Sequence, residues 1–216
     1  MAISAKQVGE LRRKTGAGLM DCKKALTETD GDMDQAVEFL QKNSLAAVGK
    51  RAGKVAAEGC VTSYIHDGRI GVLVEINSET DFVGKGDAFQ ALAKDIAMHV
   101  AASNPTYLDP SEIPAETADK QKEIYAAQLR EQGKPDQIID RILVGKMNKW
   151  HADVCLLNQA FVKDDKKSVK EHVTEIAATI KENIKVRRFV RFELGEGIEK
   201  KVDDFAAEVA AAVAGN

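Results

Sequence analysis

The stretch Asn77–Phe89, which reads NSETDFVGKGDAF, joins an apolar run to a segment with helical periodicity. The run before it, Gly71–Ile76, has the composition of a strand, so the quoted residues form a strand-to-helix connection, where proteins commonly expose functional groups. Phe82 lies in this connection between an acid and a glycine-rich segment. The local pattern favours Phe82 as a cap on the local core. The alternative is an exposed contact residue, because a monomeric protein rarely leaves a large apolar side chain in water without a use.

The composition is that of an ordinary soluble protein of one or two domains. The 216 residues are 44% hydrophobic and 30% charged, and 31 basic against 34 acidic residues give a net charge of -3. This balance gives no broad attraction to nucleic acid. No apolar segment reaches the roughly 18 residues of a membrane span, and the first residues lack the pattern of a secretory signal, so we expect a cytoplasmic protein without a membrane partner. Three widely spaced cysteines favour buried reduced thiols over a disulfide framework.

Alternating apolar residues before the connection predict a β-hairpin with one buried face. Asp67–Gly68 supplies the turn. The alternating residues are Val61, Ser63 and Ile65 on one strand and Ile70, Val72, Val74 and Ile76 on the return strand. After the connection, apolar spacing predicts an amphipathic helix over residues 89–100, which ends before Asn104–Pro105.

Residues 1–45 predict a compact domain of three helices. Ser4 and Gln7 have the spacing of a helix-capping box, and a glycine-containing break at Thr15–Gly18 separates the first two helices. A unit of this size is near the lower limit for independent folding and has little room for a catalytic cavity, so its surface is the part available for function. Residues 46–59 lack a strong apolar face and predict a linker that is partly helical and partly flexible.

Residues 60–195 predict an α+β core. Within it, residues 115–149 have the pattern of a helical hairpin that is poor in large apolar residues and projects from the body or lies against a partner. Ser168 opens a further helix, and residues 184–194, IKVRRFVRFEL, alternate as a strand with arginines on both faces. Residues 196–216 predict a C-terminal helical module. The predicted fold class is therefore α+β, with a three-helix domain, a linker, a small antiparallel sheet packed with helices and a helical hairpin, and a C-terminal helix.

Motifs for catalysis and for cofactor or metal binding are missing from the sequence. There is no GxxxxGK[ST], GxGxxG, HExxH or GxSxG pattern, and the histidines show no ligand spacing with one another or with the cysteines. We therefore expect no enzyme, no cofactor, no metal and no direct nucleotide binding. Two other classes remain open at this point. One is an adaptor that uses the three-helix domain, and the other is an RNA-binding protein that uses Arg187, Arg188 and Arg191, although the acidic balance of the chain opposes nucleic-acid binding.

Three motifs, in order and spanning almost the whole chain, resemble the translation elongation factor Ts family. Residues 14–26, KTGAGLMDCKKAL, resemble the amino-terminal signature of that family, and Thr80–Val83, TDFV, is similar to its core signature. Residues 189–200, FVRFELGEGIEK, resemble its carboxyl-terminal signature. The resemblance implies a ubiquitin-associated-like three-helix domain. It also implies a non-enzymatic guanine nucleotide exchange factor, which binds the GTPase EF-Tu with GDP and promotes GDP release by disturbing the Mg²⁺ and phosphate site.

The same resemblance implies which residues contact EF-Tu. They are Thr80, Asp81, Phe82 and Val83 near the Mg²⁺ of EF-Tu, Leu11, Gly18, Leu19 and Met20 in the N-terminal domain, and Phe205 and Val209 in the C-terminal module. Helical spacing from Cys22 and Leu26 favours Leu19 as a core residue. This leaves Met20 as the better candidate for an exposed contact.

The chain departs from the long form of the family in one respect. Long members carry two related core subdomains with a helical hairpin. Here the TDFV half passes directly into residues 95–103, DIAMHVAAS, which are similar to the second subdomain. One core unit is therefore missing, and short members of the family suggest that two chains pair to supply it. We predict a homodimer.

Overall fold

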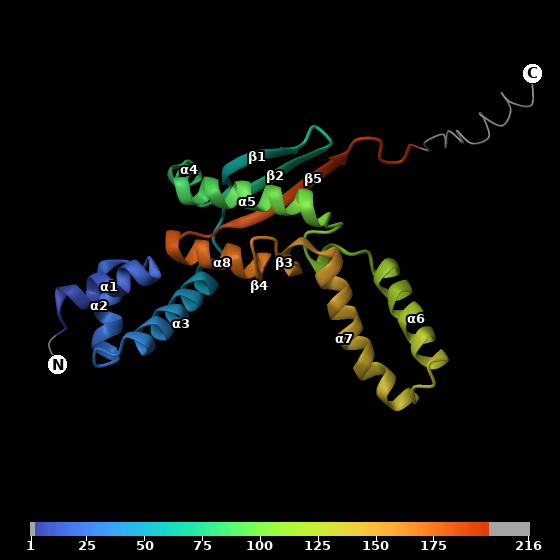
Figure 1. The fold of residues 1–216 in the computed structure, drawn as a ribbon, viewed down its shortest axis with the longest axis horizontal. Coiled ribbons are helices and arrows are strands. Elements are labelled where there is room, and N and C mark those ends of the chain that lie inside the picture. The colour runs from blue at the N-terminus through green and yellow to red at the C-terminus, as the bar shows by residue number, and fades with distance from the viewer. Residues whose placement is uncertain (1–2, 199–216) are drawn as a thin grey trace, which may run out of the picture.

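The computed structural model of the protein describes residues 3–198 (Figure 1). Helices and a small antiparallel sheet make up these residues, which confirms the predicted α+β class. The predicted C-terminal helix, including Phe205 and Val209, lies outside the described residues.

An N-terminal bundle consists of α1 (Ala5–Thr15), α2 (Leu19–Glu28) and α3 (Met33–Arg51). Ser4 starts α1 through the predicted capping box with Gln7. Gly16 ends α1 at a φ of 68°, a left-handed conformation that glycine adopts without strain. The three helices bury one small core, made of Val8, Leu11, Cys22, Ala25, Leu26, Ala36 and Leu40.

The third helix is longer than the sequence suggested, because it continues to Arg51, well inside the predicted linker at 46–59. Two contacts explain the difference. Val48 packs against the main core of the protein, and α3 lies against α8 (Val169–Ile180). In addition, Lys181 forms an ion pair of 2.6 Å with Asp21 of α2. The bundle therefore packs on the rest of the chain through α3 and α8.

The main sheet has the strand order β1-β2-β5, and both neighbouring pairs are antiparallel. Its strands are β1 (Glu58–His66), β2 (Ile70–Ser78) and β5 (Lys185–Glu193). β1 and β2 form the predicted hairpin through Asp67 and Gly68, which both have positive φ angles. Helix α5 (Asp87–Ser103) lies across one face of this sheet, and α8 packs beside α5 (Figure 1). The main core between these layers includes Val72, Val74, Ile76, Phe89, Leu92, Ile96, Val100 and Val173.

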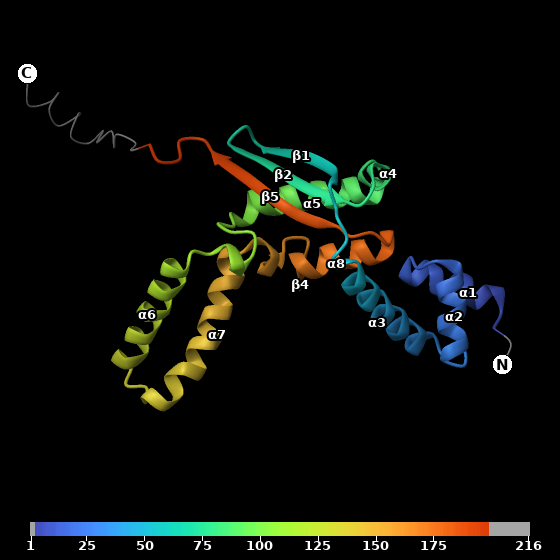
Figure 2. The ribbon, with the colours of Figure 1, turned by 180° about the vertical axis from the view of Figure 1, so that it is seen from behind.

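The other face of the sheet is apolar and lies open. The β2 residues Val72, Val74 and Ile76 point into the core on the side of α5, so the residues between them point to the other side. Val61 and Ile65 of β1 are opposite Glu75 and Gly71, which belong to that other side, so both side chains face away from α5. They are 67% and 63% exposed, so they do not lie on the buried face that the alternation predicted for the hairpin. From behind, the three strands lie in front of α5, and no element within residues 3–198 covers them (Figure 2).

A helical hairpin projects from the body, as predicted for residues 115–149 (Figure 1). It consists of α6 (Ala115–Glu131) and α7 (Asp136–Val154), which enclose a small core of Ala126, Leu129, Ile139 and Leu143. The segments beside it are η1 (Pro110–Glu112), η2 (Leu156–Asn158), β3 (Ala160–Phe161) and β4 (Asp164–Ser168). The predicted capping box at Ser168 then starts α8.

Candidate partner-binding site

The TDFV motif forms a short helix, α4 (Asp81–Gly84), at the end of the hairpin (Figure 1). Thr80 is its N-cap residue, and the Thr80 hydroxyl accepts a hydrogen bond from the backbone N–H of Val83 at 3.4 Å. The backbone carbonyl of Thr80 accepts a hydrogen bond from the Ser78 hydroxyl at 2.8 Å. These bonds turn the chain where β2 ends, and they set the direction of α4.

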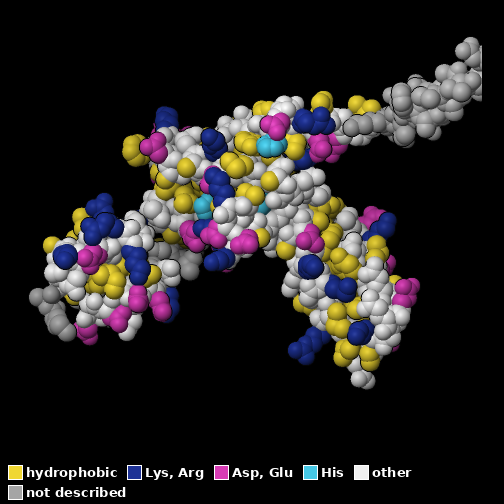
Figure 3. Space-filling view, viewed as in Figure 1, with side chains coloured by type: hydrophobic (Ala, Val, Ile, Leu, Met, Phe, Trp, Pro, Cys, Tyr) yellow, Lys and Arg dark blue, Asp and Glu magenta, His cyan; other side chains and the backbone are white. Residues whose placement is uncertain are grey.

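Phe82 on α4 is 83% exposed, so the interpretation that it caps the local core is wrong. Asp81 beside it pairs with Lys85 at 2.9 Å, and this contact lowers the pKa of Asp81 and keeps its carboxylate ionised at neutral pH. Val83 instead packs against the main core. Figure 3 shows hydrophobic, acidic and basic side chains close together at the end of the molecule where Figure 1 places α4.

A cluster of charges fixes Glu79, the residue before the motif. The Glu79 side chain is 15% exposed, and its carboxylate contacts Arg51 at 3.1 Å and Lys54 at 2.9 Å. It also accepts a hydrogen bond from the backbone N–H of Asn183 at 2.8 Å. These contacts lower the pKa of Glu79 to about 2, and the hydrogen bond from Lys54 has the largest effect, with that from Asn183 second. Because Arg51 ends α3, this cluster connects the N-terminal bundle to the TDFV turn.

A second carboxylate, that of Glu182, reaches the same turn from the connection between α8 and β5. Its Oε2 accepts hydrogen bonds from the backbone N–H groups of Glu79 and Thr80, both at 3.1 Å. Its Oε1 accepts a hydrogen bond from the Thr80 hydroxyl at 2.7 Å. Sequence reasoning missed Glu182, which belongs to none of the motifs and lies 102 positions from Thr80.

Two glycines let α4 lie close to β1. A Cβ atom on Gly84 would stand 2.9 Å from the Cα atom of Gly59, which is closer than real side chains approach. Gly59 has a φ of +124°, and a Cβ atom there would collide with the backbone carbonyl of Ile76. The sequence marked Gly84 as part of a glycine-rich segment, but it did not indicate the contact with Gly59.

The N-terminal residues that the resemblance assigned to the partner have different exposures. Leu11 is fully buried in the core of the three-helix bundle, so its predicted contact with a partner does not fit this structure. Leu19, predicted as a core residue by spacing, is 52% exposed; the residues of α2 that enter the bundle core are Cys22, Ala25 and Leu26. Met20 is 76% exposed, as predicted. The exposed pair of Leu19 and Met20 starts α2, and Gly18 is the N-cap residue before them.

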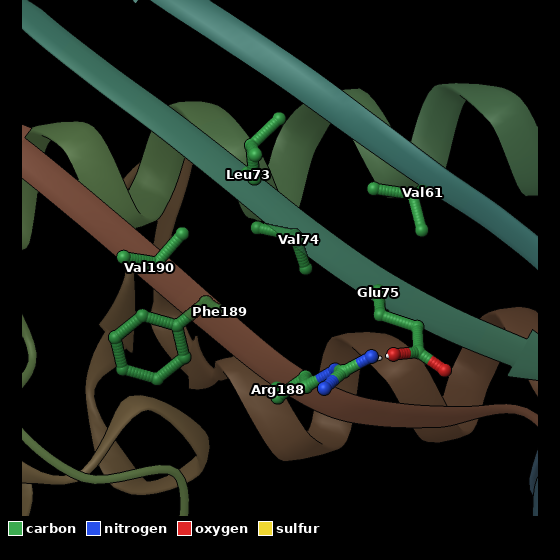
Figure 4. A pocket seen from close by; sticks show the side chains of 7 residues that line it. All are labelled: Val61, Leu73, Val74, Glu75, Arg188, Phe189 and Val190. Atoms are coloured by element: carbon green, nitrogen blue, oxygen red, sulfur yellow. Dashed lines mark hydrogen bonds and ion pairs between the residues drawn. The ribbon is translucent and has the colours of Figure 1, made fainter.

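The open face of the sheet carries a second group of exposed residues. The apolar ones are Val61, Ile65, Leu73, Val190, Phe192 and Leu194. Among them lies Glu75, whose carboxylate pairs with Arg187 at 2.7 Å and with Arg188 at 2.6 Å. These contacts lower the pKa of Glu75 to about 2, and the hydrogen bond from Arg187 has the largest effect, with that from Arg188 second. Figure 4 shows Glu75 and Arg188 meeting across β2 and β5 in a shallow groove of this face.

Two other kinds of site are absent from the part of the chain that the structure describes. None of the described helices has the length and apolar character needed to cross a membrane. Within residues 3–198, no three His, Cys, Asp or Glu side chains gather as a set that could hold a metal ion. The groups that the TDFV turn itself presents are an apolar ring on Phe82, a carboxylate on Asp81 and an ammonium group on Lys85.

Comparison with known proteins identifies the family. The family model described as Elongation factor TS matches residues 21–197. The chain belongs to the elongation factor Ts family. Elongation factor Ts of Geobacter sulfurreducens is 60% identical over 213 residues, which cover 98% of this chain and 99% of the relative. Elongation factor Ts of Geotalea daltonii is 58% identical over 213 residues, with the same coverage. Elongation factor Ts of Acetivibrio thermocellus is 54% identical over 208 residues, which cover 96% of this chain and 97% of the relative.

Membership in the elongation factor Ts family confirms the resemblance carried by the three sequence motifs, and it places the protein among the translation elongation factors. The match also bears on length. Because these relatives align over nearly their whole chains, they are similar to this chain in length as well as in sequence.

Proposed function

We propose that this protein accelerates the release of GDP from the GTPase EF-Tu, which then binds GTP. The observation that carries the proposal is the ring of Phe82, which is 83% exposed on a turn held by Glu79 and Glu182. The ionised carboxylate of Asp81 lies beside that ring. An apolar wedge next to a negative charge suits a surface where another protein holds a nucleotide through a metal ion.

The proposed mechanism acts on the metal site of EF-Tu. A P-loop GTPase holds GDP through backbone donors, a lysine and Mg²⁺, and the cation neutralises the phosphates and orders the loops around them. In our proposal Phe82 enters an apolar slot on EF-Tu and shifts the elements that position Mg²⁺. Asp81 adds negative charge close to the cation. The factor forms no covalent bond and binds no nucleotide of its own, so it acts as an exchange factor and not as an enzyme.

Thermodynamic linkage limits what one residue can supply. If the factor weakens GDP binding, GDP weakens binding of the factor to the same degree, so exchange proceeds through a ternary complex that neither ligand dominates. Burial of one phenylalanine ring contributes about 1.5 to 3 kcal/mol, or about one to two decades of affinity. Phe82 therefore needs further contacts to account for a large acceleration. Leu19 and Met20, both exposed at the start of α2, are the contacts that we propose in the N-terminal bundle.

We further propose that two copies of the chain pair through the open face of the sheet. A homodimer interface is apolar at its centre and self-complementary about a two-fold axis. The exposed side chains of Leu73, Val190 and Phe192 meet the first requirement. The carboxylate of Glu75 within the patch is paired with both Arg187 and Arg188, so it would not enter the interface as an unpaired charge.

Sedimentation velocity tests this pairing. We expect the full chain at micromolar concentration to sediment as a dimer, and Phe192→Asp to sediment as a monomer with an unchanged circular dichroism spectrum. Phe192 is 66% exposed, so the substitution places its charge in water unless a partner covers it. A monomeric unmodified chain under the same conditions would exclude pairing.

Stopped-flow fluorescence tests the exchange function. The full chain, mixed with EF-Tu that holds a fluorescent GDP and with excess unlabelled nucleotide, should accelerate release, and an unchanged rate would refute the proposal. An adaptor would instead bind through residues 1–45 without any effect on nucleotide. An RNA-binding protein would show steep salt dependence in RNA binding. Against RNA binding, Arg188 is paired with Glu75, and the side chain of Arg191 is only 10% exposed.

A further inference from the structure

Three hydrogen-bond donors at the start of the TDFV turn converge on one distant carboxylate. The backbone N–H groups of Glu79 and Thr80 donate to Oε2 of Glu182, and the Thr80 hydroxyl donates to Oε1. Hydrogen bonds to a carboxylate are stronger than those between neutral groups. Glu182 thus uses both carboxylate oxygens on a segment that is 103 positions away in the chain.

Helix α4 is too short to hold its own shape. It has only 4 residues, and a helix of this length is unstable in water because nucleation costs more than the first bonds return. The direction of Phe82 therefore depends on the groups that hold the two ends of α4. The carboxyl-terminal end is held by close contact between Gly84 and Gly59. The amino-terminal end is held by Thr80, and Thr80 is held by Glu182.

Thr80 transmits the contact into the helix. Its hydroxyl hydrogen is used in the bond to Glu182, which leaves an oxygen lone pair free to accept from the backbone N–H of Val83. One side chain thus receives orientation from Glu182 and passes it to the first turn of α4. Phe82 lies between these two bonded residues, so its backbone is fixed on both sides.

We infer that Glu182 is a positioning residue for the exchange reaction, which keeps the TDFV turn in the orientation that presents Phe82 to the partner. The inference rests on the proposed function for its consequence in exchange, but not for the anchoring itself. Glu182 lies outside the buried core of the protein, and its contacts converge on the turn. Its role is therefore local, and its loss should loosen the turn while the sheet and the helices remain folded.

The test compares Glu182→Gln with a matched control, Glu175→Gln, in the full chain. The first substitution keeps the size of the side chain but removes its charge and replaces one of the two accepting oxygens with an NH₂ donor, which then faces either the two backbone N–H groups or the Thr80 hydroxyl. The control removes the same charge on α8, where Glu175 contacts Lys167 at 2.7 Å and not the turn. Hydrogen–deuterium exchange measures the amides of residues 79–84 directly. Stopped-flow release of fluorescent GDP from EF-Tu is measured over a range of factor concentrations.

The expected result is local and specific to Glu182→Gln. The hydrogen-bonded amides in this range, those of Glu79, Thr80, Val83 and Gly84, should exchange at least about tenfold faster, since one lost charge-assisted bond corresponds to about a decade. The maximal rate of GDP release should fall at least about threefold, because a smaller fraction of bound factor presents Phe82 correctly. The half-saturating concentration should change less than about twofold, since the contacts of α2 remain. The control should match the unmodified chain in every measurement.

Different outcomes separate failure of this inference from failure of the proposed function. Unchanged exchange of the 79–84 amides in Glu182→Gln, or an equal change in the control, would refute the anchoring role. Faster exchange throughout the core strands would show a general structural role and would refute it too. Looser amides with an unchanged maximal rate would refute positioning in the reaction. If the unmodified chain fails to release GDP, the proposed function is wrong, and the hydrogen-exchange result still decides whether Glu182 holds the turn.

Discussion

Replacement of Phe82 by alanine gives the sharpest test of how this factor acts. The ring is 83% exposed, so its removal should change the free energy of unfolding by less than about 0.5 kcal/mol. If the partner covers the exposed part completely, the lost contribution is 83% of the about 1.5 to 3 kcal/mol for a buried phenylalanine. This amounts to about 1.2 to 2.5 kcal/mol, or about an 8-fold to 70-fold fall in the rate of GDP release at low factor concentration.

The assay is stopped-flow release of fluorescent GDP from EF-Tu, with urea unfolding as the check on stability. Val162→Ala is a suitable control, because Val162 is 47% exposed and its one contact with His99 comes from the backbone N–H, which the substitution keeps. We expect the control to match the unmodified chain in both measurements.

Three results would contradict the reasoning on Phe82. Release by Phe82→Ala at the unmodified rate would remove the wedge from the mechanism. A loss of several kcal/mol in unfolding free energy would show that the ring supports the fold, in conflict with its exposure. A fall in release far beyond about 70-fold would mean that the ring does more than contribute buried area.

Two further predictions concern stability. Gly84→Ala should lower the unfolding free energy by about 1 to 3 kcal/mol, because the new methyl group meets the Gly59 backbone at 2.9 Å and neither segment can move without loss of packing. An unchanged urea midpoint would contradict this. Acid should also destabilise the protein. Burial lowers the pKa of both His99 and His172, so the unfolded chain binds protons that the folded chain excludes, and stability should fall as the pH decreases below about 6.5. Urea unfolding at several pH values measures this dependence of stability on pH. His172→Phe should reduce it, because the substitution removes one of the two titrating rings. The phenyl ring gives up no hydrogen bond, since both buried ring nitrogens of His172 lack a hydrogen-bond partner among the described residues.

Most of the elements could be predicted from the sequence, because their signals are local. The capping residues Ser4 and Ser168 each open a helix through a side chain three positions away, and the alternation around the Asp67–Gly68 turn sets the hairpin. The helical hairpin at 115–149 also follows from spacing and from the break between its helices. These patterns depend on neighbours within a few residues, so they survive in the final fold.

Contacts between distant segments could not be predicted in this way. Spacing assigned Leu19 to the core, but packing of the bundle left it exposed; the family resemblance assigned Leu11 to a partner, but the bundle buries it. Alternation in β1 showed which residues share a face, but not which face α5 would cover, so Val61 was wrongly placed on the buried side. Glu182 carries no local signal at all, and only the fold brings it to Thr80.

The charged contacts around the turn fix the backbone of the short motif that carries Phe82. Glu79 receives Arg51 from the end of α3 and the Asn183 amide from the segment before β5, while the neighbouring Glu182 holds Thr80. The N-terminal bundle, the sheet and the turn therefore meet at two adjacent carboxylates. In the proposed mechanism Phe82 enters a site on EF-Tu, and a mobile turn would lose part of its binding energy to ordering. The bonds at these two carboxylates order the backbone of the turn in the free protein, so the part of that cost that comes from the backbone would be lower on binding.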